Sequence, residues 1–410
     1  MTPRETSTAS LMAYGFDPRV GNWSPWHGAK TAVLSSLAKI TCIGGKARTS
    51  RLSFQEFFGR AVNEKRWGYP AAALLGSIDA QVESGCASIG GKDSMSGTFE
   101  DINVPHTLVS FAVTHDEAKN VVSGSFKAAG NNIYMVSVPY SDLLEPDYET
   151  FLANSDVLYD LNKAGKISAM YPVGPGGIAE AVTKMAMGNM IGAELLAPEA
   201  AESSDNLSGL FVPTYGNIIV ETSEDLIKTD LKAGTVTLIG NTVADKKITV
   251  KNATLGGVTN PAVEISLDDC LAKWEDKLKD VFPRVSGAEV QPELPSWATD
   301  VHKSLSDIRK APAFVQPTSR PKVLLPVFPG TNCEIDMARA FNLAGADTKI
   351  VVLQNRTQDQ LTESLDRLAK EMRDAQILAL SGGFSSGDEP DGSAKFIATY
   401  LKLETSAKRL

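Results

Sequence analysis

The stretch IGGKDSMSG, residues 89–97, decides how the first part of the chain is interpreted, because glycines, a cation, a carboxylate and hydroxyls meet there directly after a short apolar run. Glycine lets a backbone approach a polyphosphate closely, lysine supplies a compact positive charge, and aspartate is a hard oxygen ligand that suits Mg²⁺. The pattern predicts a loop that binds phosphate and metal. Its predicted phosphate-binding residues are Gly90, Gly91, Lys92, Ser94 and Ser96, and its predicted metal ligand is Asp93.

The residues around this stretch allow two interpretations of it. Gly90 and Gly91 are adjacent, whereas a Walker A loop separates its two glycines by four residues, so a polar turn after a strand is an equal alternative. Residues 70–85 carry apolar side chains at helical spacing, and residues 107–113 alternate as a strand does. A helix followed by a short strand would deliver the loop to the edge of a sheet.

Composition bounds the class of protein and its partners. With 410 residues, 43% of them hydrophobic, the chain can bury more than one core. Its net charge of −9 is well mixed and includes no basic run, which argues against nucleic acid or an anionic membrane as a partner. Four cysteines without paired spacing give no sign of a disulfide framework or a zinc site, and no stretch reaches the roughly 18 apolar residues of a membrane span. We therefore expect a cytoplasmic, multidomain protein.

Two short segments before residue 60 hold possible substrate-contacting residues. His27 lies in an aromatic and proline-rich loop over residues 15–28, where a structural role beside Trp26 is the alternative to a ligand contact. Arg48 lies in a basic segment and is either solvated or in contact with a substrate phosphate. Ser53 is predicted to cap a helix that carries its phenylalanines on one side.

From residue 127 the pattern is that of a second α+β unit. Residues 131–138 read as a strand, and Gly176-Gly177 precede a helix over residues 178–187. Paired glycines at a helix N-terminus suit either an anion or close packing of the helix on a sheet. Further strands are predicted at residues 216–220, 235–240 and 247–250.

Residues 322–380 alternate strand and helix signals after a proline-punctuated linker, which predicts a parallel, doubly wound sheet. Asn332 is predicted to cap the first helix of this region, and the last strand enters Ser381-Gly382-Gly383. Cys333 is a tempting nucleophile, but the four histidines are at positions 27, 106, 115 and 302, so no histidine follows it to act as its base.

Several of these pieces together resemble the phosphoribosylformylglycinamidine synthase family in its large, single-chain form, the glutamine-dependent enzyme of de novo purine synthesis. They are WSPWHGA (23–29), LSFQE (52–56), residues 90–97 with FED (99–101), Gly176-Gly177, FPGTNCE (328–334) and SGGFSSGD (381–388). The resemblance implies an α+β aminoimidazole ribonucleotide synthetase-like repeat, with an N subdomain (1–126) and a C subdomain (127–290). A linker (291–320) and a truncated α/β class I glutamine amidotransferase-like domain (321–410) would follow.

The same resemblance implies the reaction. ATP, with Mg²⁺, would activate the amide oxygen of formylglycinamide ribonucleotide as a phosphate ester, and ammonia from glutamine would displace the phosphate to give formylglycinamidine ribonucleotide. Gly382 and Gly383 would belong to the oxyanion loop of the glutaminase. The catalytic histidine of the family belongs to the first synthetase repeat, and the glutaminase nucleophile and its histidine–glutamate pair would lie beyond residue 410, so no catalytic residue is assigned here. We expect the first domain to form a homodimer, because the repeat that would cover its sheet is missing.

The chain departs from the family at four positions. A glutamate and an asparagine that bind Mg²⁺ in the family correspond to Ser35 and Lys39, and an aspartate and a serine before the glycine pair correspond to Pro172 and Gly174. This repeat is therefore a degraded auxiliary nucleotide site, or it contributes only Lys92 and Asp93 to a site shared with the missing repeat. A third alternative is a non-catalytic scaffold that pairs with the catalytic repeat. A kinase-like enzyme of the same fold is disfavoured, because such enzymes carry no glutaminase region.

Overall fold

The computed structural model describes residues 7–95, 97–197, 206–255, 258–282, 320–382 and 397–398. The chain forms two compact units, residues 1–286 and 287–410. Nearly all of the predicted linker lies outside the described residues. No helix in the described ranges is long and apolar enough to cross a membrane.

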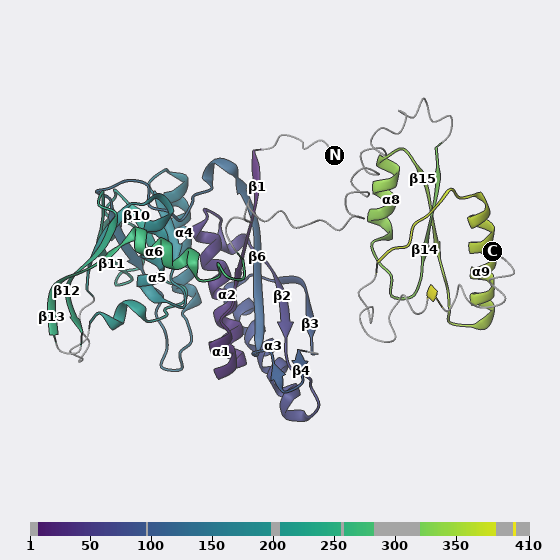
Figure 1. The fold of residues 1–410 in the computed structure, drawn as a ribbon, viewed down its shortest axis with the longest axis horizontal. Helices are drawn as coiled ribbons and strands as arrows, with labels where there is room; N and C mark the ends of the chain where they lie inside the picture. Colours follow the sequence, from purple (N-terminus) through teal and green to yellow (C-terminus); the bar gives the residue numbers. More distant parts are fainter. Residues whose placement is uncertain are drawn as a thin grey trace. The chain divides into compact units, whose positions relative to one another are not determined.

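The first sheet of unit 1 has the strand order β1-β6-β2-β3. Strand β6 pairs antiparallel with β1 and β2, and β3 pairs parallel with β2 at the edge. Two long helices, α2 and α3, lie beside the sheet, with the short helix α1 leading into α2 (Figure 1). The bounds are β1 Thr8–Gly15, α1 Pro18–Trp23, α2 Pro25–Cys42, β2 Arg51–Phe57, α3 Glu64–Ser84, β3 Ser88–Ser94 and β6 Thr107–Glu117, with a small hairpin of β4 Thr98–Phe99 and β5 Ile102–Asn103.

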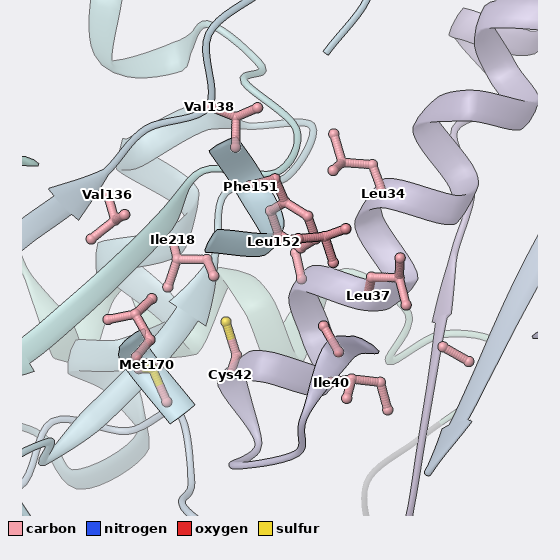
Figure 2. Packing of buried hydrophobic residues seen from close by; sticks show 14 of the residues in the cluster. Leu34, Leu37, Ile40, Cys42, Val136, Val138, Phe151, Leu152, Met170 and Ile218 are labelled. Carbon is pink, nitrogen blue, oxygen red and sulfur yellow. The ribbon is translucent and has the colours of Figure 1, made fainter. Parts of the chain in front are cut away.

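Helix α2 is the central element of unit 1 because it is buried on almost every side. It begins after Ser24, whose side chain accepts a hydrogen bond from the His27 N–H, and it has a proline in its first turn. Figure 2 shows Leu34, Leu37 and Ile40 of this helix packing against residues of the second half of the unit. The two predicted subdomains thus share one hydrophobic core. The residues of the second half of the unit that take part in this core include Phe151, Leu152, Met170 and Ile218.

The second sheet of unit 1 has seven strands in the order β13-β12-β9-β11-β7-β10-β8, and a second core cluster lies between it and helix α5. This is the α+β unit predicted from residue 127, and each predicted strand is present with shifted ends. Its helices are α4 Tyr148–Lys163, α5 Gly177–Asn189 and α6 Leu267–Asp276. Its strands are β7 Asn132–Val136, β8 Ala169–Pro172, β9 Gly192–Leu196, β10 Ile218–Thr222, β11 Val236–Val243, β12 Lys247–Leu255 and β13 Val258–Ser266.

Unit 2 has the parallel sheet that its alternating pattern predicts, in the order β15-β14-β16. Apolar residues of β14 form the centre, and α9 presents buried leucines to it. The elements are β14 Lys322–Val327, α8 Glu334–Leu343, β15 Asp347–Val352, α9 Gln358–Asp374 and β16 Ile377–Leu378. The predicted cap is wrong: Cys333, not Asn332, precedes α8, and no side chain caps this helix.

Two predictions for the first sheet are also wrong. Residues 51–57, expected to be helical from Ser53, form strand β2, because Leu52 and every second residue after it face the helices while the aromatic residues suit a pleated strand. Residues 88–94, expected to form a loop after residue 89, form strand β3. A Cβ at Gly91 would lie 2.3 Å from the carbonyl oxygen of Phe54, so this glycine is required for close strand pairing.

Candidate functional site

The residues predicted to bind phosphate and metal lie on an edge strand. Gly90, Gly91, Lys92, Asp93 and Ser94 all belong to β3, while Ser96 is outside the described residues. A Cβ at Gly90 would meet nothing within 4 Å, so the backbone is open to a ligand there. One side of β3 pairs with β2, and its other side is the edge of the described sheet.

The strand geometry divides the predicted site between two faces, because successive side chains of a strand point to opposite sides of its sheet. The Lys92 ammonium lies 4.8 Å from the ring centroid of Phe57, on the face that the helices do not cover. Asp93 lies opposite Glu56 in the register of β2 and β3, on the face with the helices. Lys92 and Asp93 therefore do not converge on one point as residues of a loop would.

Glu56 is the functional candidate that the sequence interpretation missed. Burial, with the neighbouring Asp93 carboxylate as a smaller cause, raises the pKa of Glu56 to about 7. Its Oε1 is buried and has no hydrogen-bond partner among the described residues. The sequence LSFQE (52–56) could have identified Glu56, because in a strand this residue lies on the same inner face as Leu52 and Phe54. The prediction of a helix from Ser53 did not place it there.

The Glu56–Asp93 pair can supply two carboxylates to a cation. No group of three or more His, Cys, Asp or Glu at metal-binding spacing occurs in the described ranges, so the pair alone is an incomplete metal site. Mg²⁺ is commonly held by one or two carboxylates together with waters and phosphate oxygens. The donor set and the unpartnered oxygen of Glu56 therefore fit a Mg²⁺ ion that arrives with a polyphosphate. A cation here would also favour release of the Glu56 proton.

The N-terminus of α5, the other predicted anion position, is filled by side chains of its own helix. The Gly176 N–H donates to Glu180 Oε2 at 2.6 Å, and the Lys184 ammonium donates to the other oxygen of Glu180. Burial acts to raise the pKa of Glu180, but these hydrogen bonds lower it overall. A Cβ at Gly177 would lie 2.4 Å from the Leu210 carbonyl oxygen, so close packing explains this glycine.

Lys39 stands at one of the positions where the resemblance led us to expect a metal ligand. Its ammonium donates to the carbonyl oxygen of Tyr14 at 2.7 Å and lies 4.1 Å from the Tyr14 ring centroid. Burial and then the nearby ammonium of Lys184 lower the pKa of Lys39. Ser35 has a buried hydroxyl without a partner among the described residues. Two ammonium groups near one carboxylate form a poor metal site.

The two possible substrate-contacting residues are engaged within the protein. The ring of His27 contacts Ser24 Oγ through Nδ1 at 2.8 Å and the Leu143 carbonyl oxygen through Nε2 at 3.0 Å. Its ring centroid also lies 4.7 Å from that of Trp23 and 4.8 Å from that of Trp26, which agrees with its structural interpretation. Arg48 pairs with Asp156 at 2.5 Å.

The predicted glutaminase loop is described only as far as Gly382, and Gly383 is outside the described residues. The Asn332 N–H donates to the Gly382 carbonyl oxygen at 2.8 Å, which joins the segments that follow the parallel strands β14 and β16. Ligands of parallel sheets bind at this carboxyl edge. Cys333 is exposed there with a left-handed backbone, φ 68°, at the start of α8.

Known proteins are similar to both regions of the chain. A family model described as a CobB/CobQ-like glutamine amidotransferase domain matches residues 320–410. The PurQ subunit of phosphoribosylformylglycinamidine synthase from Dehalococcoides mccartyi is 36% identical over 90 residues, covering 22% of this chain and 31% of that protein. The PurL subunit from Synechocystis sp. is 25% identical over 223 residues, 48% of this chain and 28% of that protein. The PurL subunit from Campylobacter curvus is 30% identical over 213 residues, 47% of this chain and 28% of that protein.

Solved structures agree in fold. Thermotoga maritima PurL complexed with AMPPCP has a TM-score of 0.50 at 11% identity and covers 64% of this chain and 44% of its own. The PurLQS structure from the same organism has a TM-score of 0.50 at 13% identity, and the match covers 63% of this chain and 44% of that chain. The chain spans less than a third of the length of the curated relatives named above. It is nonetheless PurL-like in fold and related in sequence to both PurL and PurQ, so its resemblance to phosphoribosylformylglycinamidine synthase is confirmed.

Proposed function

We propose that the chain is part of an ATP- and glutamine-dependent amidoligase that converts formylglycinamide ribonucleotide to formylglycinamidine ribonucleotide. One observation carries the proposal: a single chain joins a region similar to PurL with a region similar to PurQ, which are named as subunits in the relatives. A synthetase that consumes ammonia and a domain that releases it from glutamine gain from a covalent link, because the link raises their effective concentration. The enzyme would act in the cytoplasm.

The synthetase-like repeat would contribute to holding ATP. Mg²⁺, when bound, would neutralise charge on the phosphates of ATP. Asp93 with Glu56 would hold the ion, and the open backbone at Gly90 would lie along the phosphates. Lys92 would act from the opposite face, where its ammonium can meet a phosphate at the boundary with a second repeat. The residues that activate the amide belong, on this proposal, to that second repeat.

The uncovered face of the first sheet is the proposed surface for that partner. Met12, Tyr14 and Val113 are 66%, 54% and 37% exposed and lie on neighbouring strands β1 and β6. An apolar face of this kind favours association, so the chain by itself should form a homodimer through it. In sedimentation experiments at roughly tens of micromolar chain, we expect dimer, and Met12→Glu should convert it to monomer. Wild-type chain that stays monomeric would contradict this proposal.

A genetic experiment tests the function. Deletion of the gene in its host should abolish growth without purines, and growth should return when a purine base or the wild-type gene is supplied. The Asp93→Asn gene should restore growth less well, while Asp101→Asn, which changes an exposed turn residue in the following hairpin, should restore it fully. Unimpaired growth of the deletion strain without purines would refute the proposed function.

A second candidate function is a non-catalytic scaffold that pairs with the catalytic repeat and carries the glutaminase. The arrangement of Lys39, Glu180 and Lys184 favours it, because these side chains occupy the region where an auxiliary nucleotide would bind its metal. The N and C subdomains, divided near residue 126, would then serve chiefly to present the outer sheet face. Absence of any nucleotide binding to the purified chain would favour the scaffold over the auxiliary site.

A further inference from the structure

A cavity of about 600 Å³ opens in the second half of unit 1, away from strand β3. It lies between helices α5 and α6 and strands β9, β12 and β13, with the short 3₁₀ helix η3 (Ser208–Phe211) at one side. This volume is in the range of pockets that hold small molecules. Its walls are predominantly aliphatic and aromatic side chains, among them Leu207, Leu210, Val250 and Val263.

The mouth of the cavity exposes aromatic surface. Trp274 on α6 and Phe211 on η3 line the cavity and are 61% and 58% exposed. Large aromatic rings left in water at the rim of an apolar hollow carry a cost that an apolar ligand would relieve. The apolar part of a ligand would therefore lie between these two rings and the sheet.

The polar groups of the lining are mainly cationic. On α6, Lys273 and Trp274 lie three and four residues after Cys270, so one face of this helix lines the cavity, and Lys277 directly follows the helix. Lys184 contributes from α5, with its ammonium 5.1 Å from the Trp274 ring centroid.

The single carboxylate in the lining, Glu180, is held by Lys184 and the Gly176 N–H. Neither Lys273 nor Lys277 is among the ion pairs of the described residues. The lining thus holds three lysines and one carboxylate, and the acidic residues of α6, which are Asp268, Asp269, Glu275 and Asp276, lie outside it.

We propose that this cavity binds an amphipathic anion, an acyl chain that carries a carboxylate. The acyl chain would fill the space beneath Trp274 and Phe211, and the carboxylate would lie at the rim beside Lys273. Apolar burial supplies the affinity, and the rim charge selects an anion over a cation of equal length. The inference is independent of the proposed amidoligase function, because it uses neither β3 nor unit 2.

Displacement of a fluorescent probe from the full chain tests the proposal. Anilinonaphthalene sulfonate, an apolar anion, should bind once per chain and gain fluorescence. Dodecanoate should displace it, with half-displacement at roughly tens of micromolar, while dodecyltrimethylammonium should be at least about tenfold weaker. Equal displacement by the two detergents would overturn the proposal. So would absence of probe binding, including absence because another part of the chain fills the cavity.

Variants of exposed residues locate the site without disturbing the core. Lys273→Glu should weaken dodecanoate binding roughly fivefold and Trp274→Ala should abolish single-site probe binding. Lys279→Glu, a control on the same segment that does not line the cavity and pairs with Asp276, should leave both unchanged. Dodecanoate binding that is equally strong in Lys273→Glu and the control, with all variants folded by circular dichroism, would overturn the assignment.

Discussion

The Glu56 carboxyl should make unit 1 less stable as the pH rises. Its pKa is raised from an ordinary value of 4.5 to about 7, so between these two pH values the folded protein holds a proton that the unfolded chain has released. Under these conditions the free energy of unfolding falls with increasing pH, and it stays lower above pH 7. Replacing Glu56 by glutamine removes the titration. The variant should match wild type near pH 4.5 and exceed it at pH 8.

The size of this difference follows from the shift. Each pKa unit corresponds to about 1.4 kcal/mol, so a shift from 4.5 to about 7 has a ceiling of roughly 3.4 kcal/mol. The carboxyl is only partly buried and keeps some hydration, so we halve this value to about 1.7 kcal/mol. Asp93→Asn should give a smaller gain of the same sign, because burial is the larger cause of the shift.

Urea unfolding between pH 4.5 and pH 8 measures this difference. Tryptophan fluorescence follows chiefly unit 1, because four of the five tryptophans, Trp23, Trp26, Trp67 and Trp274, lie within it. The exposed Asp101→Asn substitution serves as the control and should show no pH-dependent gain. A Glu56→Gln variant that is less stable than wild type at pH 8, or that differs from it equally at every pH, would refute the assigned environment of Glu56.

Two further predictions concern the paired strands and unit 2. Gly91→Ala should lower the free energy of unfolding by about 1–3 kcal/mol, because the added Cβ would meet the Phe54 carbonyl oxygen. Gly90→Ala should change it little, and equal effects of the two substitutions in urea unfolding would contradict the close pairing of β3 and β2. The chain should release no glutamate from glutamine, because no histidine follows Cys333; glutamate release above a buffer blank that Cys333→Ala abolishes would show the opposite.

The elements that the sequence predicts well are those with strong local signals at both ends. The parallel sheet of unit 2 is an example, because its apolar strands alternate with helices that end near a glycine such as Gly345. Strand β2 is the counterexample. Phe54, Phe57 and Phe58 fit a helical face as well as a pleated strand, and the pairing with β6 and β3 decides between them. That pairing is a long-range property, which a local pattern does not contain.

The candidate site shows the same limit more sharply. The residues of β3 could be singled out from composition alone, but the pairing of Asp93 with Glu56 depends on the register of two strands that are far apart in sequence. Lys92 and Asp93 point to opposite faces because they lie on a strand. The two adjacent glycines before them are typical of a loop, so the local sequence did not predict this strand. The α5 N-terminus was likewise a predicted anion site, because the sequence alone does not show that the Glu180 side chain accepts a hydrogen bond from the Gly176 N–H.

Calorimetric titration of the chain with Mg-ATP tests the central claim, that any nucleotide bound by this repeat lies at β3. We expect binding no tighter than roughly tens of micromolar, because the two carboxylates alone form an incomplete Mg²⁺ site. Asp93→Asn should weaken it about tenfold and Lys92→Ala less, because Lys92 lies on the opposite face of β3, whereas Glu180→Gln at the α5 N-terminus should leave it unchanged. Submicromolar binding that survives both β3 substitutions would contradict the account.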